Sequence, residues 1–197
     1  MTYTATYLSD FHHTLDSVSH DTLERLVAEL VAVRNRGGRL FFLGVGGSAA
    51  NCSHAVNDFR KIAGFEAYTP TDNVAEITAR TNDDGWDTTF ERWLMGSRLR
   101  ASDAVFVLSV GGGTQTTSLN LVHAVRYARQ VGATVLGIVG RDGGYTAKMA
   151  QACVVVKTVS SPFDMSDAIT PYTESMQSVL LHLLVFHPHL RHVYDHP

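Results

Sequence analysis

The stretch Leu40-Phe41-Phe42-Leu43-Gly44-Val45-Gly46-Gly47-Ser48 decides the fold. Its first half is a short, unbroken apolar run, which is typical of a strand buried on both faces of a parallel sheet. Its second half is a glycine-rich turn, and an alanine-rich segment of helical character follows over 49–61. A buried strand, a glycine turn and a helix in this order predict one βα unit of an α/β protein.

The same pattern recurs downstream. Further buried-type strands are predicted at 66–69, 104–108, 133–139 and 152–156. Helical stretches are predicted at 119–130 and, strongly apolar, at 170–186. Strands that alternate with helices predict a parallel sheet covered by helices on both faces. We therefore expect a three-layer αβα sandwich around a doubly wound parallel sheet of about five strands.

Two amphipathic segments precede the first strand. Apolar residues recur at helical spacing over 8–18 and again over 23–31, and Gly37-Gly38 ends the second segment. They predict an N-terminal helical hairpin. Because no linker or repeat divides the 197 residues, we expect one domain over 1–197. Its parts are N-terminal helices at 1–36, a core at 39–186 and a tail at 187–197.

Composition excludes several classes of protein. Hydrophobic residues make up 45% of the chain and charged residues 18%, which is globular. A formal charge of −3 gives no basic surface for nucleic acid or an anionic membrane. No apolar run approaches the ~18 residues of a membrane span, and 1–10 carry no secretory signal. The two cysteines form neither a disulfide framework nor a metal knuckle, so we expect a cytoplasmic protein.

Two glycine-rich turns are candidates for binding phosphate. One contains Gly46, Gly47 and Ser48, and the other contains Ser109, Gly111 and Thr114. Ligands of such folds bind beyond the carboxyl ends of the strands, where helix N-termini favour anions and hydroxyls donate hydrogen bonds. For either turn taken alone, glycines that serve only to make a tight turn are as good an explanation as a phosphate site. The presence of two equivalent turns favours the phosphate interpretation.

Two pairs of polar residues are candidates for metal or proton chemistry. His54 and Asp58 are four residues apart and therefore share a helix face. Such a pair can bind a metal or act as an acid–base couple, or it can be an ordinary surface pair. Glu174 and His182 lie on the last, otherwise apolar helix. Eight residues separate the second pair by ~12 Å and ~80° around the helix. One metal could therefore contact both only if their side chains reach toward each other.

These motifs together resemble the phosphoheptose isomerases of the sugar isomerase (SIS) domain family. The resemblance is carried by Gly44-x-Gly-Gly-Ser-Ala-Ala, His54, Asn82-Asp83, the turn at Ser109 and Gly140-x-Asp-Gly-Gly, and it runs from about residue 8 to 184. It implies a homotetramer with active sites at subunit interfaces and a small-molecule phosphosugar as ligand. It also implies isomerisation of sedoheptulose 7-phosphate to a manno-heptose 7-phosphate, usually with Zn²⁺.

The resemblance assigns roles to the polar pairs. The family's metal histidine and glutamate fall on His54 and Asp58, and its late-helix glutamine and histidine fall on Glu174 and His182. All four are thereby expected to hold Zn²⁺. The chain departs from the family in its second turn. The family has Ser-Thr-Ser-Gly-Asn-Ser there, whereas this chain has Ser109-Val-Gly-Gly-Gly-Thr114. It also has Val45 in place of an asparagine and Tyr172 in place of an arginine.

An aldose–ketose isomerisation through an enediol needs a base, an acid and an electrophile. We expect Asp58 or Glu174, with His182, to transfer protons, and Zn²⁺ to polarise the carbonyl. Asn82 and Asp83 precede a helix predicted at 88–95 and either contact sugar hydroxyls or simply form a turn and a helix cap. Two alternatives stay open: an isomerase of another phosphosugar, and a non-catalytic sugar-phosphate sensor or scaffold.

Overall fold

The sheet is parallel throughout, as predicted. The computed structural model describes residues 2–158 and 168–192. Its strands are β1 (Leu40–Leu43), β2 (Ala67–Tyr68), β3 (Ala104–Ser109), β4 (Thr134–Val139) and β5 (Ala152–Val155), in the spatial order β2-β1-β3-β4-β5. The order reverses between β1 and β3, so the opening for a ligand lies at their carboxyl ends. The expected αβα sandwich with five parallel strands is confirmed.

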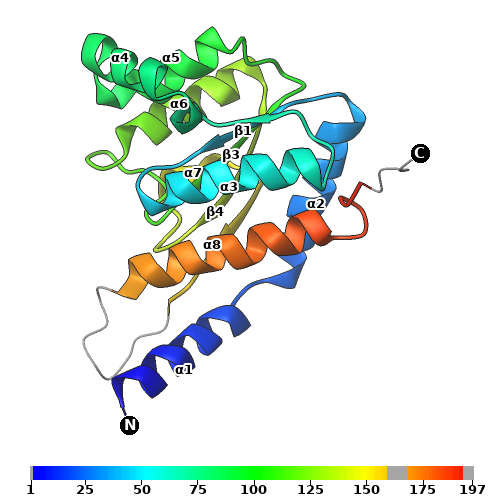
Figure 1. The fold of residues 1–197 in the computed structure, drawn as a ribbon, viewed down its shortest axis with the longest axis vertical. Helices are drawn as coiled ribbons and strands as arrows, with labels where there is room; N and C mark the ends of the chain where they lie inside the picture. Colours follow the sequence, from blue (N-terminus) through cyan, green and yellow to red (C-terminus); the bar gives the residue numbers. More distant parts are fainter. Residues whose placement is uncertain (1, 159–167, 193–197) are drawn as a thin grey trace.

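Helices cover both faces of this sheet (Figure 1). The α-helices are α1 (Tyr3–Asp16), α2 (His20–Asn35), α3 (Gly47–Lys61), α4 (Val74–Asp84), α5 (Thr89–Gly96), α6 (Leu119–Val131), α7 (Gly144–Met149) and α8 (Ile169–Phe186). Two short 3₁₀ turns, η1 (Pro70–Asp72) and η2 (Trp86–Thr88), flank α4. Two N-terminal helices and the strongly apolar last helix are present where the sequence predicts them, but α1 contacts α8 rather than folding back on α2 as a hairpin.

Alternation along the strands builds two cores. Phe42 and Phe106 point into a core shared with α2, α3 and α8, whereas Phe41 and Val105 point into a second core shared with α5 and α6. Every residue of β1 is buried, which explains its unbroken apolar run. Burial of this kind stabilises by ~25 cal/mol per Å² of apolar surface removed from water. The first core holds α3 and α8 on the same face of the sheet.

Helix α4 is the main element that the sequence did not predict. Asn73 caps it by accepting a hydrogen bond from Glu76 N at 3.1 Å, but none of its residues is buried. Without a buried stripe, it lacks the periodic apolar pattern that reveals a helix. Asn82 and Asp83 therefore lie in the last turn of α4, and not in the turn that was expected before a helix.

Helix α1 is unusual because it buries polar residues and exposes apolar ones. Thr6, Asp10 and Thr14 are buried, whereas Leu8 is 62% exposed and Leu15 is also exposed. Tyr172 ties α1 to α8, because its hydroxyl donates to the backbone oxygen of Tyr7 at 3.1 Å.

Neither free cysteine is fully accessible, and burial raises the pKa of the Cys153 thiol to about 12.

Over residues 2–158 and 168–192, no helix combines the length and apolarity needed to cross a bilayer. Of the predicted tail at 187–197, residues from 193 onward lie outside the described part of the chain.

Candidate functional site

A polar bridge fixes α3 against α8. The Asn51 side chain on α3 donates to the backbone oxygen of Glu174 at 2.9 Å and to Oε1 of Gln177 at 3.1 Å. Gln177 is fully buried and donates in turn to the backbone oxygen of Ile138 at 3.4 Å. The two helices therefore lie side by side (Figure 1), with their relative position set by hydrogen bonds as well as by apolar packing.

This packing brings His54, Asp58 and His182 together. Oδ2 of Asp58 lies 3.2 Å from Nε2 of His54 and 3.4 Å from Nε2 of His182. The two imidazole rings are 5.0 Å apart and nearly perpendicular. The Asp58 side chain is 14% exposed, but those of His54 and His182 are 52% and 46% exposed. One carboxylate thus stands between two imidazoles at the surface of the chain.

The donor set of this cluster suits Zn²⁺. One ligand atom from each of the three residues lies within 4.8 Å of the other two. Zinc accepts imidazole nitrogen and carboxylate oxygen, and catalytic zinc sites use three protein ligands while leaving a fourth position open. Among the described residues this is the one group of histidine, cysteine and acidic side chains close enough to share an ion. The residues therefore fit the expected metal.

Glu174 does not join the other three residues within one chain. Its carboxylate lies against Gly47 in the first turn of α3, where a Cβ added to the glycine would be 2.6 Å from the Glu174 Cδ. Glu174 and His182 are eight positions apart, a rise of ~12 Å along α8, which explains why their side chains do not meet. Within one chain, three of the four predicted residues come together, and the Glu174 carboxylate lies against the start of α3 instead.

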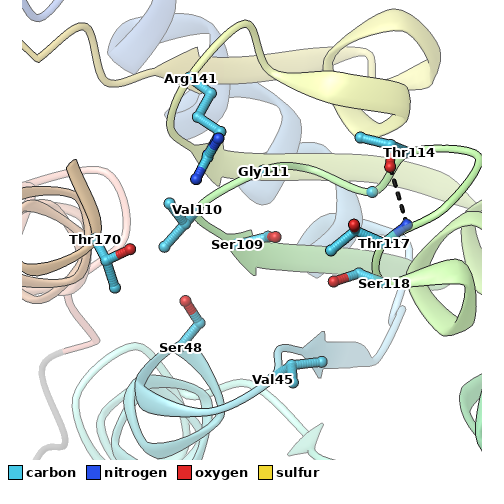
Figure 2. A pocket seen from close by; sticks show the side chains of 11 residues that line it. Val45, Ser48, Ser109, Val110, Gly111, Thr114, Thr117, Ser118, Arg141 and Thr170 are labelled. Atoms are coloured by element: carbon cyan, nitrogen blue, oxygen red, sulfur yellow. Dashed lines mark hydrogen bonds between the residues drawn. The ribbon is translucent and has the colours of Figure 1, made fainter. Parts of the chain in front are cut away.

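A cavity of about 320 Å³ opens at the carboxyl ends of β1 and β3. It is lined by Val45, Ser48, Ser109, Val110, Gly111, Gly113, Thr114, Thr117, Ser118, Arg141 and Thr170. Figure 2 shows the hydroxyl of Ser48 directed into it from the start of α3. Ser48 is 1% exposed, and within the described chain its Oγ has no hydrogen-bond partner. A buried hydroxyl without a partner is costly, and a ligand in the cavity would satisfy it.

The loop after β3 holds its own shape. Ser109 Oγ accepts from Gly112 N at 3.0 Å, and Thr114 Oγ1 accepts from Thr116 N at 3.3 Å and Thr117 N at 3.0 Å (Figure 2). Residues 115–118 then separate the loop from α6, so the second glycine turn does not lead straight into a helix as expected. Preorganised hydroxyls and backbone groups around a hollow are suited to holding an anion.

Of the predicted phosphate residues, Ser48, Ser109, Gly111 and Thr114 line this cavity, and Gly46 and Gly47 adjoin it at the start of α3. Asn82 and Asp83 do not line it. They are exposed on α4, where Asn82 Nδ2 donates to Asp83 Oδ1 at 2.8 Å.

Sequence reasoning missed four lining residues, Thr117, Ser118, Arg141 and Thr170. Apart from the GxDGG turn around Arg141, nothing in their local pattern marks them. Tyr172, at the position of the family's arginine, is 1% exposed, and burial raises its pKa. Its ring packs 4.7 Å from that of Tyr7, so it serves the contact between α1 and α8 and brings no charge to the cavity.

Comparison with known proteins agrees with this arrangement. A family model described as the SIS domain matches residues 6–140. The chain belongs to the SIS domain family. A phosphoheptose isomerase from Sulfurimonas denitrificans is 34% identical over 142 residues, which cover 69% of this chain and 70% of the relative. The SIS resemblance seen in the glycine turns is thus confirmed, together with the likeness to phosphoheptose isomerases.

Solved structures share the fold. A phosphoheptose isomerase from Neisseria gonorrhoeae superposes with a TM-score of 0.75 at 22% identity, covering 93% of this chain and 92% of the other. The NanR protein of Vibrio vulnificus, complexed with ManNAc-6P, gives 0.61 at 14% identity, covering 92% of this chain and 58% of the other. At these identities the likeness concerns the fold alone.

Proposed function

We propose that this SIS protein is an isomerase that interconverts sedoheptulose 7-phosphate and D-glycero-D-manno-heptose 7-phosphate through an enediol. The observation that carries the proposal is the His54–Asp58–His182 cluster on the same two helices, α3 and α8, whose first turns contribute Ser48 and Thr170 to the cavity. Ser48 and His54 are six residues apart, about 9 Å along the helix. This separation suits a substrate with its phosphate at one end and its reacting carbons at the other.

In this proposal the cavity binds the phosphate. Ser48 Oγ would donate to a phosphate oxygen, and so gain the partner that it lacks in the described chain. No side-chain hydrogen bond caps α3, so the N–H groups of its first turn would bind the phosphate alongside the Glu174 carboxylate that lies against Gly47. Ser109, Thr114 and the backbone of Gly111 would complete the wall. Binding energy from the phosphate would then orient the reacting end of the sugar.

We propose His54, Asp58 and His182 as the ligands of one Zn²⁺. When bound there, zinc would act as a Lewis acid toward the carbonyl oxygen of the sugar. Asp58 bound to a metal would be a poor base, which leaves Glu174 as the carboxylate for the C–H proton. In the single chain its carboxylate lies against Gly47 at the start of α3, beside the phosphate cavity, so this role requires the Glu174 carboxylate to approach the cluster when substrate binds. His182 would hold or deliver a proton at the substrate oxygen whenever it is not engaged by the metal.

We also propose that the active protein is a homotetramer with active sites at subunit interfaces, located in the cytoplasm. His54 and His182 are about half exposed, and Val179, Leu183 and Phe186 expose apolar surface near them on α8. A second copy packed here would shield the reacting groups from water, which strengthens electrostatic interactions. Free cysteines fit a reducing compartment.

A second candidate is an isomerase of a different phosphosugar. Two observations favour it: Val45 and Val110 present apolar side chains in the cavity where the resembled family has polar ones. A third candidate, a non-catalytic sugar-phosphate sensor, is favoured by the same loss of hydroxyls. The His–Asp–His cluster opposes it, because a sensor has no need of a metal-binding group there.

NMR of the purified protein with sedoheptulose 7-phosphate, with zinc and after chelation, tests the proposal. We expect aldose signals to grow with zinc present and to stop growing after chelation. Conversion of another phosphosugar alone would favour the second candidate. No conversion of any phosphosugar, together with an absence of bound zinc, would favour the third.

A further inference from the structure

Among the residues that the structure describes, Arg141 is the one charged residue that lines the phosphate cavity. It lies in the turn between β4 and α7, and Figure 2 shows its guanidinium extending from this turn to the space beside Val110 and Thr170. The opposite wall carries the hydroxyl of Ser48 (Figure 2). A cation and a buried, unpartnered hydroxyl therefore face one hollow from two different elements.

The backbone holds Arg141 in this place at a cost. Its φ is +50°, in the left-handed region that a residue with a Cβ rarely adopts. The surrounding turn is closed by Gly143 N donating to Gly140 O at 2.9 Å and by Gly144 N donating to Asp142 Oδ1 at 3.1 Å. Strained backbone of this kind is concentrated at functional sites, where the surrounding structure enforces it.

The turn is also fixed to the loop after β3. Thr146 donates through both its N–H and its hydroxyl to Gly112 O, at 2.9 and 2.8 Å. The arginine side chain runs beside Gly111, where an added Cβ would make an ordinary van der Waals contact with the Arg141 Cδ at 3.9 Å. The aliphatic part of the Arg141 side chain thus lies beside the loop after β3, which lacks the hydroxyls of the resembled family. Its guanidinium is left to reach a ligand.

Across residues 2–158 and 168–192, no hydrogen bond or ion pair engages the Arg141 guanidinium. Guanidinium binds phosphate through two parallel N–H···O bonds, and such charge-assisted bonds are about twice as strong as neutral ones. We infer that Arg141 binds the phosphate group of the substrate and replaces the hydroxyl contacts absent at Val110 and Gly111. This inference rests on the proposed function in that it takes the ligand to be a phosphosugar.

Calorimetric titration of the full chain with inorganic phosphate tests this inference without requiring turnover. The test variant is Arg141→Gln, which removes the charge and keeps most of the side chain's length. The matched control is Arg98→Gln, because Arg98 is also an exposed arginine with φ near +50° (52°) but does not line the cavity. Arg141→Lys keeps the charge and loses the paired geometry.

We expect Arg141→Gln to weaken phosphate binding about tenfold to 100-fold, Arg141→Lys to weaken it less, and Arg98→Gln to leave it within about twofold. Equal affinities for the unchanged protein and Arg141→Gln would overturn the inference, as would no binding of phosphate by the unchanged protein at millimolar concentrations. If phosphate binding depends on Arg141 but the protein isomerises no phosphosugar, the inference is upheld and only the proposed function is contradicted.

Discussion

Asp58 is the residue on which the proposed metal centre depends, because its Oδ2 is shared by two imidazoles. Among the described residues, Asp58 is the one acidic side chain paired with either histidine, so it orients both Nε2 atoms toward one point. It is one methylene shorter than glutamate. The cluster shows that the shorter side chain still reaches both rings.

The variant Asp58→Asn should lose zinc. An amide removes the charge that the cluster offers to a cation, and since changes outside the ligand shell already weaken metal sites by about 10–100-fold, we expect a loss of at least ~100-fold. Elemental analysis after dialysis would measure zinc per chain, with Asp58→Glu as the control that keeps a carboxylate and should retain the metal. Equal zinc in all three proteins would contradict the assignment.

Gly47 and Glu174 form the second pair that matters at this scale. Gly47 has ordinary helical backbone, so its lack of a Cβ is explained by the carboxylate packed against it. The substitution Gly47→Ala should displace the Glu174 carboxylate, which is the end of a flexible side chain, and so lower kcat while costing about 1 kcal/mol or less of unfolding free energy. In a Glu174→Ala background it should be neutral or stabilising, because alanine favours helix. Urea unfolding of the four proteins measures this coupling, and additive effects would contradict the contact.

At the scale of elements, the loop after β3 and the turn after β4 support each other. A Cβ at Gly112 would meet the Gly143 backbone, 2.6 Å from its carbonyl carbon, and the φ of Gly112 is +66°. Gly37 has nearly the same φ, +68°, but open space around it. Alanine substitutions at the two glycines therefore distinguish the cost of a left-handed backbone conformation, present in both, from the cost of breaking the contact between loop and turn, present only at Gly112.

We expect Gly37→Ala to cost about 1–2 kcal/mol of unfolding free energy and Gly112→Ala about 1–3 kcal/mol more. Urea unfolding measures both, and phosphate binding should suffer only in Gly112→Ala. Equal destabilisation of the two variants, with phosphate affinity unchanged, would show that the contact does not shape the cavity.

How much the sequence reveals differs from element to element for physical reasons. Strands β1, β3 and β4 are buried along their whole length, so their apolar runs were visible without the structure. Helix α4 buries nothing, and its sequence carries no comparable signal. The helical rise between Glu174 and His182 already indicated that one ion would not readily meet both.

The candidate site was predictable where spacing decides it. His54 and Asp58 share a face at i, i+4, and the structure confirms that they are adjacent. That His182 reaches the same point depends on how α3 packs on α8, through Asn51 and Gln177, which no local pattern specifies. Arg141 was missed for the same reason, because its place in the cavity follows from the contact between two loops.

At the scale of the whole molecule, exposed apolar side chains on α1 and α8 point to assembly. Leu8 and Leu15 on α1, and Phe186 at 54% exposure on α8, are open to solvent in the single chain. Thr6 Oγ1 and Asp10 Oδ2 are buried in α1, and the described chain offers them no partner. Packing of identical surfaces about a symmetry axis would cover the exposed apolar side chains. It could also supply hydrogen-bond partners to the two buried polar atoms.

Light scattering at micromolar concentration should therefore give a mass well above one chain, and that of four under the tetramer proposal. Leu15→Glu should shift the mass downward, because a buried charge without a partner is costly at an interface. Val74→Glu, on the exposed face of α4, serves as the control and should leave the mass unchanged. A monomer under these conditions would rule out active sites shared between subunits.

Proton NMR of sedoheptulose 7-phosphate in D₂O, with the zinc-supplemented protein, tests the central claim most directly. If Glu174 moves a proton between neighbouring carbons, the aldose should form and deuterium should enter the carbon that receives the proton. The variant Asp58→Asn should do neither. A fully zinc-loaded, unchanged protein that leaves the sugar phosphate both unconverted and unlabelled would contradict the account.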